Sequence, residues 1–357
     1  MCEGADIYST LYSLAGRVFS TRGSHIVLLA VAYVVFSRVG QVFAIPPGNV
    51  TAVWIPSGIV LSAILLKGNY LWPGIFIGAF IVNIWGYCDF STSDNILRSV
   101  IASACNGVGN SIAAIFGAHF IKRMTGSIYP FIKGSDVFVF ILYGAVMGGG
   151  ISAVIGVTSL SLVGFVEWSG YLTVWVTWWV GNVVGVLLFV PVLLSVHHWK
   201  EWGWLTINSG CELLLFFVSL LVLSLLVVEG NIVSPSITLP VILLLPLLIW
   251  SVFRFPNHVT FLSMVIMSAL ILIEKAQFFG MSAPGLVDVS ILEIQLFMFV
   301  VSVTSLVLLA NKENKDQIEA SLLAANRYNR TLFDELSIGL ALCCILRTKM
   351  ITLCGPK

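Results

Sequence analysis

Long apolar segments recur along this chain and leave it few ways to fold. Crossing the roughly 30 Å hydrocarbon core of a bilayer takes about 20 mainly apolar residues as a helix. A backbone in hydrocarbon must satisfy its polar groups internally, so these segments are expected to be helices. We expect about ten of them, in the ranges 25–45, 51–66, 71–87, 97–121, 136–166, 171–196, 211–228, 237–253, 258–274 and 290–310.

The composition agrees with a chain that is surrounded mainly by lipid. Hydrophobic residues make up 58% of the 357 residues and charged residues only 10%, against about 25% charged residues in a soluble domain. The sequence therefore predicts an all-α integral membrane protein, a polytopic bundle of about ten transmembrane helices. The count falls to about eight or nine if the segments that contain Pro56, Pro73, Pro240 and Pro246 are re-entrant or cross only half of the bilayer.

The charges of the loops predict which side of the membrane each loop faces, because Lys and Arg accumulate in short cytoplasmic loops. If the N-terminus is inside, alternate loops carry the basic residues Lys67, Lys122, Arg123, Lys133, Lys200 and Arg254. The intervening loops carry mainly acidic residues, namely Asp89, Asp94, Glu167, Glu229 and Asp288. We therefore expect a multi-pass protein with both termini in the cytoplasm.

Three glycine pairs at GxxxG spacing lie inside the expected spans. Glycines at this spacing let two helix backbones approach closely, so these faces are expected to point into the bundle. Packing alone explains them better than ligand binding does. The pairs are Gly74 with Gly78, Gly144 with Gly148, and Gly181 with Gly185.

Polar side chains inside the spans are the candidates for a functional site, because each costs free energy unless it faces protein, a cavity or a partner. Arg38 is the most costly, at about 2.5 to 3.5 kcal/mol for an arginine at the centre of a span, and Gln41 shares its helical face. The other candidates are Asn83, Asn106, Asn110, Trp178, Trp179 and Asn182. We predict one polar cavity that binds a ligand or couples ligand binding to the helices. Two alternatives stay open: the arginine staples helices or reaches an interface, and the amides only hold helices together.

No motif points to catalysis, a cofactor or a metal. The chain has no GxxxxGK[ST] phosphate loop, no HExxH helix and no GxSxG elbow. Its seven cysteines include no CxxC pair and are expected to be free thiols. His197 and His198 stand beside Lys200 in an expected cytoplasmic loop, where a solvated edge explains them better than a metal site. We expect no enzyme and no nucleic-acid partner; the expected partners are the lipid bilayer and an unidentified stimulus.

A solvated linker helix is expected after the last span, over residues 311–329. Ile318, Ala325 and Leu332 recur at intervals of seven residues, as in a coiled-coil seam. Their companions Ser321 and Tyr328 are poor core formers, which favours a solvated helix. The seam still allows a homodimer through the last span and the linker.

Three motifs follow one another along the chain: AVWIPSGI at residues 52–59, LWPGIFIGAF at 71–80, and WWVGNVVGVL at 178–187 with Pro191 after it. Together, over residues 25–310, they resemble the first class of bacterial membrane-associated sensor domains, the MASE family. The resemblance implies a sensory input module in the bacterial inner membrane, of the kind fused to a histidine kinase, a diguanylate cyclase or a phosphodiesterase. It adds Trp54 and Pro56 of the first motif to the site candidates. Asn182 stands where the family pattern leads us to expect an acidic residue.

The tail is expected to begin a further domain. Residues 330–342 (RTLFDELSIGLAL) resemble the opening of a PAS domain. A PAS fold needs roughly 100 residues, and the pattern ends after Cys343, so we expect a truncated or frame-shifted chain without its output domain. The expected parts are a cytoplasmic segment 1–24, a membrane-embedded sensor 25–310, the linker 311–329 and a truncated PAS-like start 330–357.

Two functions fit these observations. The first is the sensory input module, without catalysis. The alternative is a secondary transporter or permease for a small solute, which proline-containing helices and asparagines near the membrane midplane also suit. Binding without movement of the ligand across the membrane separates a sensor from a transporter.

Overall fold

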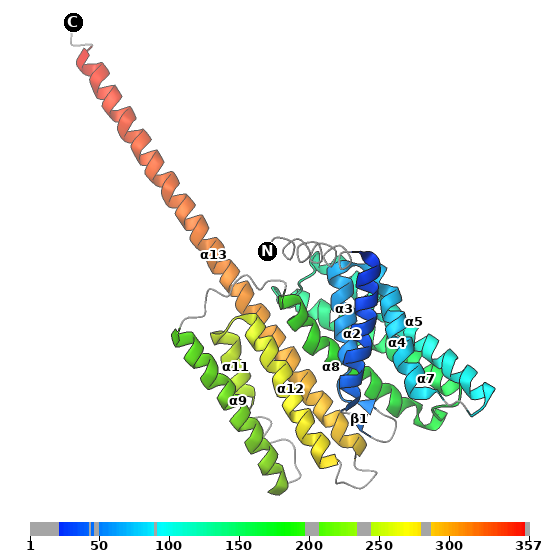
Figure 1. The fold of residues 1–357 in the computed structure, drawn as a ribbon. Coiled ribbons are helices and arrows are strands. Elements are labelled where there is room, and N and C mark those ends of the chain that lie inside the picture. The colour runs from blue at the N-terminus through cyan, green and yellow to red at the C-terminus, as the bar shows by residue number, and fades with distance from the viewer. Residues whose placement is uncertain are drawn as a thin grey trace, which may run out of the picture. The chain divides into compact units, whose positions relative to one another are not determined.

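The computed structural model describes residues 21–42, 44–45, 50–88, 91–196, 207–233, 244–279 and 287–353. The chain forms two compact units, 1–310 and 311–357, and the described secondary structure is almost wholly helical (Figure 1). The strands among these residues are β1 (Ala44–Ile45) and β2 (Val50–Thr51), which pair antiparallel. Besides most of the N-terminal segment 1–24, several residues singled out from the sequence lie outside the described ranges: Asp89, His197, His198, Lys200 and Pro240.

The first unit is a bundle of helices that follow one another along the chain, and each expected span overlaps one of them. They are α2 (Arg22–Val42), α3 (Ile55–Lys67), η1 (Asn69–Leu71), α4 (Trp72–Tyr87), α5 (Ser93–Thr125), α6 (Gly134–Val139), η2 (Phe140–Met147), α7 (Gly148–Leu162), η3 (Trp168–Gly170), α8 (Tyr171–Ser195), α9 (Ile207–Val233), α11 (Leu245–Arg254), α12 (Asn257–Phe279) and the first part of α13 (Val287–Leu353).

Six of the helical stretches in the described chain are long and apolar enough to cross a membrane. They are Arg22–Gln41, Asn69–Tyr87, Ser93–Thr125, Gly134–Leu162, Trp168–Ser195 and the apolar start of Leu292–Ile338. Shorter apolar helices occur at Ile55–Lys67, Gly210–Leu223, Leu245–Arg254 and Asn257–Ile273. The chain is therefore an all-α, multi-pass membrane protein.

The outer face of the bundle is apolar. On α2, for example, Val27, Leu28 and Val31 are each more than half exposed. Contiguous apolar faces of this kind are rare on soluble monomers, whereas they suit contact with lipid tails.

Three of the prolines expected to interrupt spans lie instead in the first turn of a helix. Pro56 starts α3, Pro73 starts α4 and Pro246 starts α11. A proline in this position removes no hydrogen bond, because the amide it lacks has no partner inside the helix. These prolines therefore begin helices, while Pro191 lies inside α8.

Capping residues, and not apolarity, set the ends of α5. At its start the side chain of Thr92 accepts a hydrogen bond from the Asn95 amide at 3.2 Å. At its end Gly126 adopts a left-handed conformation, with φ of 66°, which glycine does without steric cost. The helix therefore extends beyond the expected 97–121 at both ends.

The six glycines of the GxxxG pairs all lie where helices approach closely. A Cβ on Gly74 would sit 2.5 Å from the Ile26 carbonyl oxygen, and one on Gly78 would meet α2 as closely. Gly144 and Gly148 face α5. Since α2 contacts α4, α4 contacts α5, and α5 contacts α7, these glycines bring the first half of the bundle together.

The tightest approach is between α8 and the start of α3. A Cβ on Gly185 would overlap the carbonyl oxygen of Trp54, and one on Gly181 would lie 3.0 Å from the carbonyl oxygen of Thr51. The amide of Trp54 donates a hydrogen bond to the carbonyl of Gly181 at 3.0 Å. Of the six long stretches α8 is the most deeply buried, with 61% of its most apolar window inside the bundle, so this approach lies at the centre of the first unit.

The second unit is described as helix as far as Leu353, the end of α13. The linker and the PAS-like segment 330–342 both lie in this helix. The described side chains from 315 to 338 are exposed.

Candidate functional site

A buried polar stripe runs along one face of α5. Ser99, Ser103, Asn106 and Asn110 recur at intervals of four and three residues, and each is at least 94% buried. The amide nitrogen of Asn106 donates to the Ala102 carbonyl at 3.1 Å, and that of Asn110 to the Asn106 carbonyl at 2.9 Å. Because the helix itself satisfies both nitrogens, the two amide oxygens are left to face the neighbouring helices.

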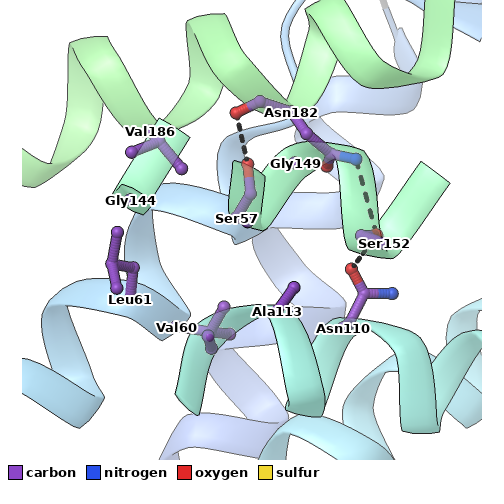
Figure 2. A pocket seen from close by; sticks show the side chains of 12 residues that line it. Ser57, Val60, Leu61, Asn110, Ala113, Gly144, Gly149, Ser152, Asn182 and Val186 are labelled. Carbon is purple, nitrogen blue, oxygen red and sulfur yellow. Dashed lines mark hydrogen bonds between the residues drawn. The ribbon is translucent and has the colours of Figure 1, made fainter. Parts of the chain in front are cut away.

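A small cavity lies beside this stripe, between helices α3, α5, α7 and α8 (Figure 2). Its volume is about 20 Å³, counted as the space that the centre of a water molecule can reach; one water needs about 10–15 Å³ by this measure. Helices α3, α5, α7 and α8 and segment η2 all contribute to the wall. The lining residues are Ser57, Val60, Leu61, Asn110, Ala113, Ala114, Gly144, Gly148, Gly149, Ser152, Asn182 and Val186.

Hydrogen bonds join the polar residues of the wall into one chain (Figure 2). Ser152 Oγ donates to Asn110 Oδ1 at 3.0 Å. Asn182 Nδ2 lies 3.5 Å from Ser152 Oγ and donates to it. Ser57 Oγ lies 3.1 Å from the Asn182 carbonyl oxygen and 2.6 Å from that of Trp54. These hydrogen bonds thus link α5, α7, α8 and α3 across the cavity.

Two amide oxygens of this region have no hydrogen-bond partner within the described chain. They are Asn182 Oδ1, in the cavity wall, and Asn106 Oδ1, one turn from Asn110, and both residues are 99% buried. Gly156 leaves room for the second, since a Cβ there would lie 2.6 Å from Asn106 Oδ1. An unpaired polar atom at such depth is costly, by about 1–3 kcal/mol. The site therefore presents acceptors to a donor, and the wall contains no ionisable side chain.

A π-helical segment, η2 (Phe140–Met147), forms one end of the wall. π-Segments inside α-helices are rare and often mark functional sites. Here the indole of Trp179 on α8 donates a hydrogen bond from Nε1 to the Val146 carbonyl at 2.8 Å. Gly144 inside the segment and Gly148 directly after it line the cavity, and neither places a side chain in it.

Trp179→Phe is expected to lower the free energy of unfolding by about 1 kcal/mol, because it keeps an aromatic ring but removes the indole N–H that donates to a helix carbonyl. The measurement is titration with sodium dodecyl sulfate of protein in dodecyl maltoside. Trp168→Phe is the control, since Trp168 is 59% exposed and outside the cavity. Equal stability of the two variants would show that the bond between Trp179 and η2 contributes nothing.

Arg38 does not join the asparagines. Its guanidinium donates to Gln41 Oε1 at 3.0 Å and lies 4.2 Å from the ring centre of Trp85, and the side chain is exposed, near the end of α2. Asn83 is separate too, since it does not line the cavity. Its Nδ2 donates to the Ala79 carbonyl of its own helix at 2.8 Å. The expected single cavity therefore contains Asn110 and Asn182, with Asn106 beside it, and lacks Arg38, Gln41 and Asn83.

The remaining candidates frame the cavity without lining it. Trp54 precedes α3 and packs edge-on to Tyr33, with ring centres 6.4 Å apart. Pro56 is buried in the first turn of α3. The indole of Trp178 lies against Gly156, with a ring carbon 3.3 Å from where a Cβ would be.

Three polar residues of this region were not predicted from the sequence: Ser57, Ser152 and Gln295. A serine inside a span is a weak signal, because its hydroxyl can bond to a carbonyl of its own helix. Gln295 on α13 is fully buried, and its Nε2 donates to the carbonyls of Ala52 at 3.1 Å and Thr177 at 3.3 Å. The sequence feature that could have identified Gln295 is its place as the one glutamine within the last apolar segment, 290–310.

The comparison with protein families gives one match. The MASE1 family model matches residues 25–314, a range that contains every residue of the cavity wall. No match was found among curated proteins or among solved structures.

Proposed function

We propose a function from one premise: this chain belongs to the MASE1 family, a membrane-associated sensory domain of signalling proteins. The proposal is that the first unit is the input module of a signalling protein, which senses a small neutral molecule in the cavity between α3, α5, α7 and α8. Binding would bias the bundle between two packings, and the last span would pass the change to the cytoplasmic tail.

The observation that carries the proposal is the unpaired oxygen of Asn182. It lies in the wall of a cavity at the centre of the unit, where nothing in the described chain donates to it. A guest that donates a hydrogen bond would remove that cost, whereas a charged guest would lose its hydration without a counter-charge in the wall. The ligand class that fits is therefore a neutral hydrogen-bond donor, and the volume of about 20 Å³ holds one little larger than water. A larger guest requires α3, α5, α7 and α8 to move apart, which is the second packing that the proposal invokes.

The contacts of Gln295 support a route from the cavity to the tail. Gln295 lies on α13 and bonds to Thr177, on the same helix as Asn182, and to Ala52, just before α3. Thr177 belongs to α8 and Ala52 lies three residues before α3, and both of these helices build the cavity wall. A shift of α8 relative to α3 would therefore act directly on the last span.

We also propose about ten spans with both termini in the cytoplasm of the bacterial inner membrane. Four of the basic residues that suggest this topology lie at the C-terminal ends of three helices: Lys67 in α3, Lys122 and Arg123 in α5, and Arg254 in α11. In the proposed topology these ends all face the cytoplasm. Reporter fusions after Lys67, Arg123 and Arg254 test it, and activity of a periplasmic reporter at any of them would contradict it.

Ligand binding is tested by thermal unfolding of the purified protein against a library of neutral small molecules. We expect at least one compound to raise the melting temperature of the wild type and of Asn83→Leu, and to have no effect on Asn182→Leu. Asn83 is the matched control because its amide bonds within its own helix, away from the cavity. A stabilisation that survives in Asn182→Leu would place the binding site elsewhere.

Transport is the rival function, and the same compound decides between the two. A sensor binds its ligand without moving it, so proteoliposomes that contain the protein should take up the labelled compound no faster than empty liposomes. Uptake that depends on Asn182 would favour a permease.

A further inference from the structure

The second unit carries an exposed seam of mainly apolar residues, which we call the linker seam. Its residues follow one another at alternating intervals of four and three: Ile318, Leu322, Ala325, Asn329, Leu332 and Leu336. The large apolar members are exposed, Ile318 by 51%, Leu322 by 58%, Leu332 by 38% and Leu336 by 61%. All lie in α13, so they form one stripe along a helix.

The spacing places these residues in a coiled-coil heptad. A step of four leads from a d position to the next a position, and a step of three leads from a to d. Leu322, Asn329 and Leu336 are therefore at a, and Ile318, Ala325 and Leu332 at d. Ser321 and Tyr328 are poor core formers, but in this register they are at the flanking g positions and therefore lie outside the a and d core of the coiled coil.

We propose that the linker seam packs against the linker seam of a second copy of this chain, as a parallel two-stranded coiled coil in register. This proposal does not rest on the sensory function. Asn329 argues for the second copy, because an asparagine at a single a position is satisfied when it meets the same asparagine of an identical helix. Isoleucine at d with leucine at a favours more strands, but one buried asparagine favours two.

The connection to the membrane unit argues for the parallel arrangement. The seam begins shortly after Ala310, where the first unit ends. Two copies with one topology release their tails from the same side of the membrane, so equivalent residues start at the same height. The seam spans fewer than three heptads, which is short for an isolated coiled coil, but anchoring in one membrane raises the effective concentration of the two helices.

The flanking positions are compatible with this pairing. In a parallel pair each g position faces the next e position of the other helix. Ser321 then faces Asn326, and Tyr328 faces Phe333. No like charges oppose each other at these positions, and the second pair adds aromatic contact.

Two adjacent alanines provide a matched test by disulfide cross-linking. Ala325 is at d, in the seam, whereas Ala324 is at c, on the outer face, and both are exposed in the described chain. Each is replaced by cysteine in the full chain with its native cysteines changed to serine, and membranes are oxidised with copper phenanthroline. We expect Ala325→Cys to form dimers at least about five times faster than Ala324→Cys. Equal rates, or no dimer with either, would overturn the proposal.

The role of Asn329 is tested by the register. Two differently tagged copies, one with Ala325→Cys and one with Leu332→Cys, are expressed together, so that a mixed disulfide requires a shift of one heptad. We expect almost no mixed dimer with Asn329 present and a several-fold increase with Asn329→Leu. Mixed dimers at the same yield in both backgrounds would contradict a register set by this residue. Unchanged thermal unfolding of the membrane unit confirms that the variants are folded.

Discussion

Gly185→Ala is expected to lower the free energy of unfolding by about 3 kcal/mol, the upper end of the usual cost of overpacking. A Cβ at this position would overlap the Trp54 carbonyl oxygen and lie 2.7 Å from Ser57 Oγ. The obstacle is backbone, which cannot turn away as a flexible side chain can. The measurement is the sodium dodecyl sulfate titration used for Trp179→Phe.

The start of α3 has little freedom to yield to the added methyl group. The amide of Trp54 is bonded to the Gly181 carbonyl at 3.0 Å, one turn before Gly185. Ser57 Oγ is within 3.1 Å of the Asn182 carbonyl. A shift of α3 away from α8 would stretch both bonds and displace the wall of the cavity, so a loss of ligand binding is expected together with the loss of stability.

Gly86→Ala is the matched control for this prediction. Gly86 is also in a helix, and a Cβ there would meet nothing within 4 Å. Alanine is the better helix former by about 1 kcal/mol, so this variant should be as stable as the wild type or slightly more stable. If Gly185→Ala behaved like Gly86→Ala, the α3–α8 approach would not be as rigid as the structure indicates.

Much of the fold could be predicted from the sequence, because the length of each apolar segment and the spacing of its glycines are local features that can be read directly. A helix within each expected segment, over the residues that the structure describes, and the close approaches at Gly74, Gly144 and Gly185 belong to this group. Pro56, Pro73 and Pro246 lie in the first turns of helices. Since α3 and α11 are shorter than a full span, the number of spans stays a prediction. The π-helical segment η2 was not predictable either, since it depends on how α8 and α5 pack around it.

The candidate site was predicted only in part. The free-energy cost of a polar side chain in a span shows that it needs a partner, but not where in the fold that side chain lies. Arg38 has the highest cost at a span centre, but it lies near a helix end, where its guanidinium reaches Gln41 and Trp85. Asn110 and Asn182 carry no charge, and only the crossing of α5, α7 and α8 brings them to one cavity. The sequence shows which side chains need a partner; the tertiary packing decides which partner they obtain.

Gln295→Glu is expected to destabilise the protein more than a neutral replacement does. Gln295 is fully buried, and its Nε2 donates to two backbone carbonyls. A carboxylate there would face those carbonyls without a counter-charge, and an uncompensated buried charge costs about 3–5 kcal/mol. The measurement is the sodium dodecyl sulfate titration used for Gly185→Ala.

The neutral variant Gln295→Leu separates the charge from the lost hydrogen bonds. It leaves the carbonyls of Ala52 and Thr177 without their donor, so a loss of about 1–3 kcal/mol is expected. Gln317 supplies the control, because it is exposed in the second unit and Gln317→Glu should be as stable as the wild type. Equal stability of Gln295→Glu and Gln295→Leu would mean that water reaches this position. In that case Gln295 would not hold the last span to α8 and to the residues before α3 through buried hydrogen bonds. The proposed route from the cavity to the tail would then lack its contact with the last span.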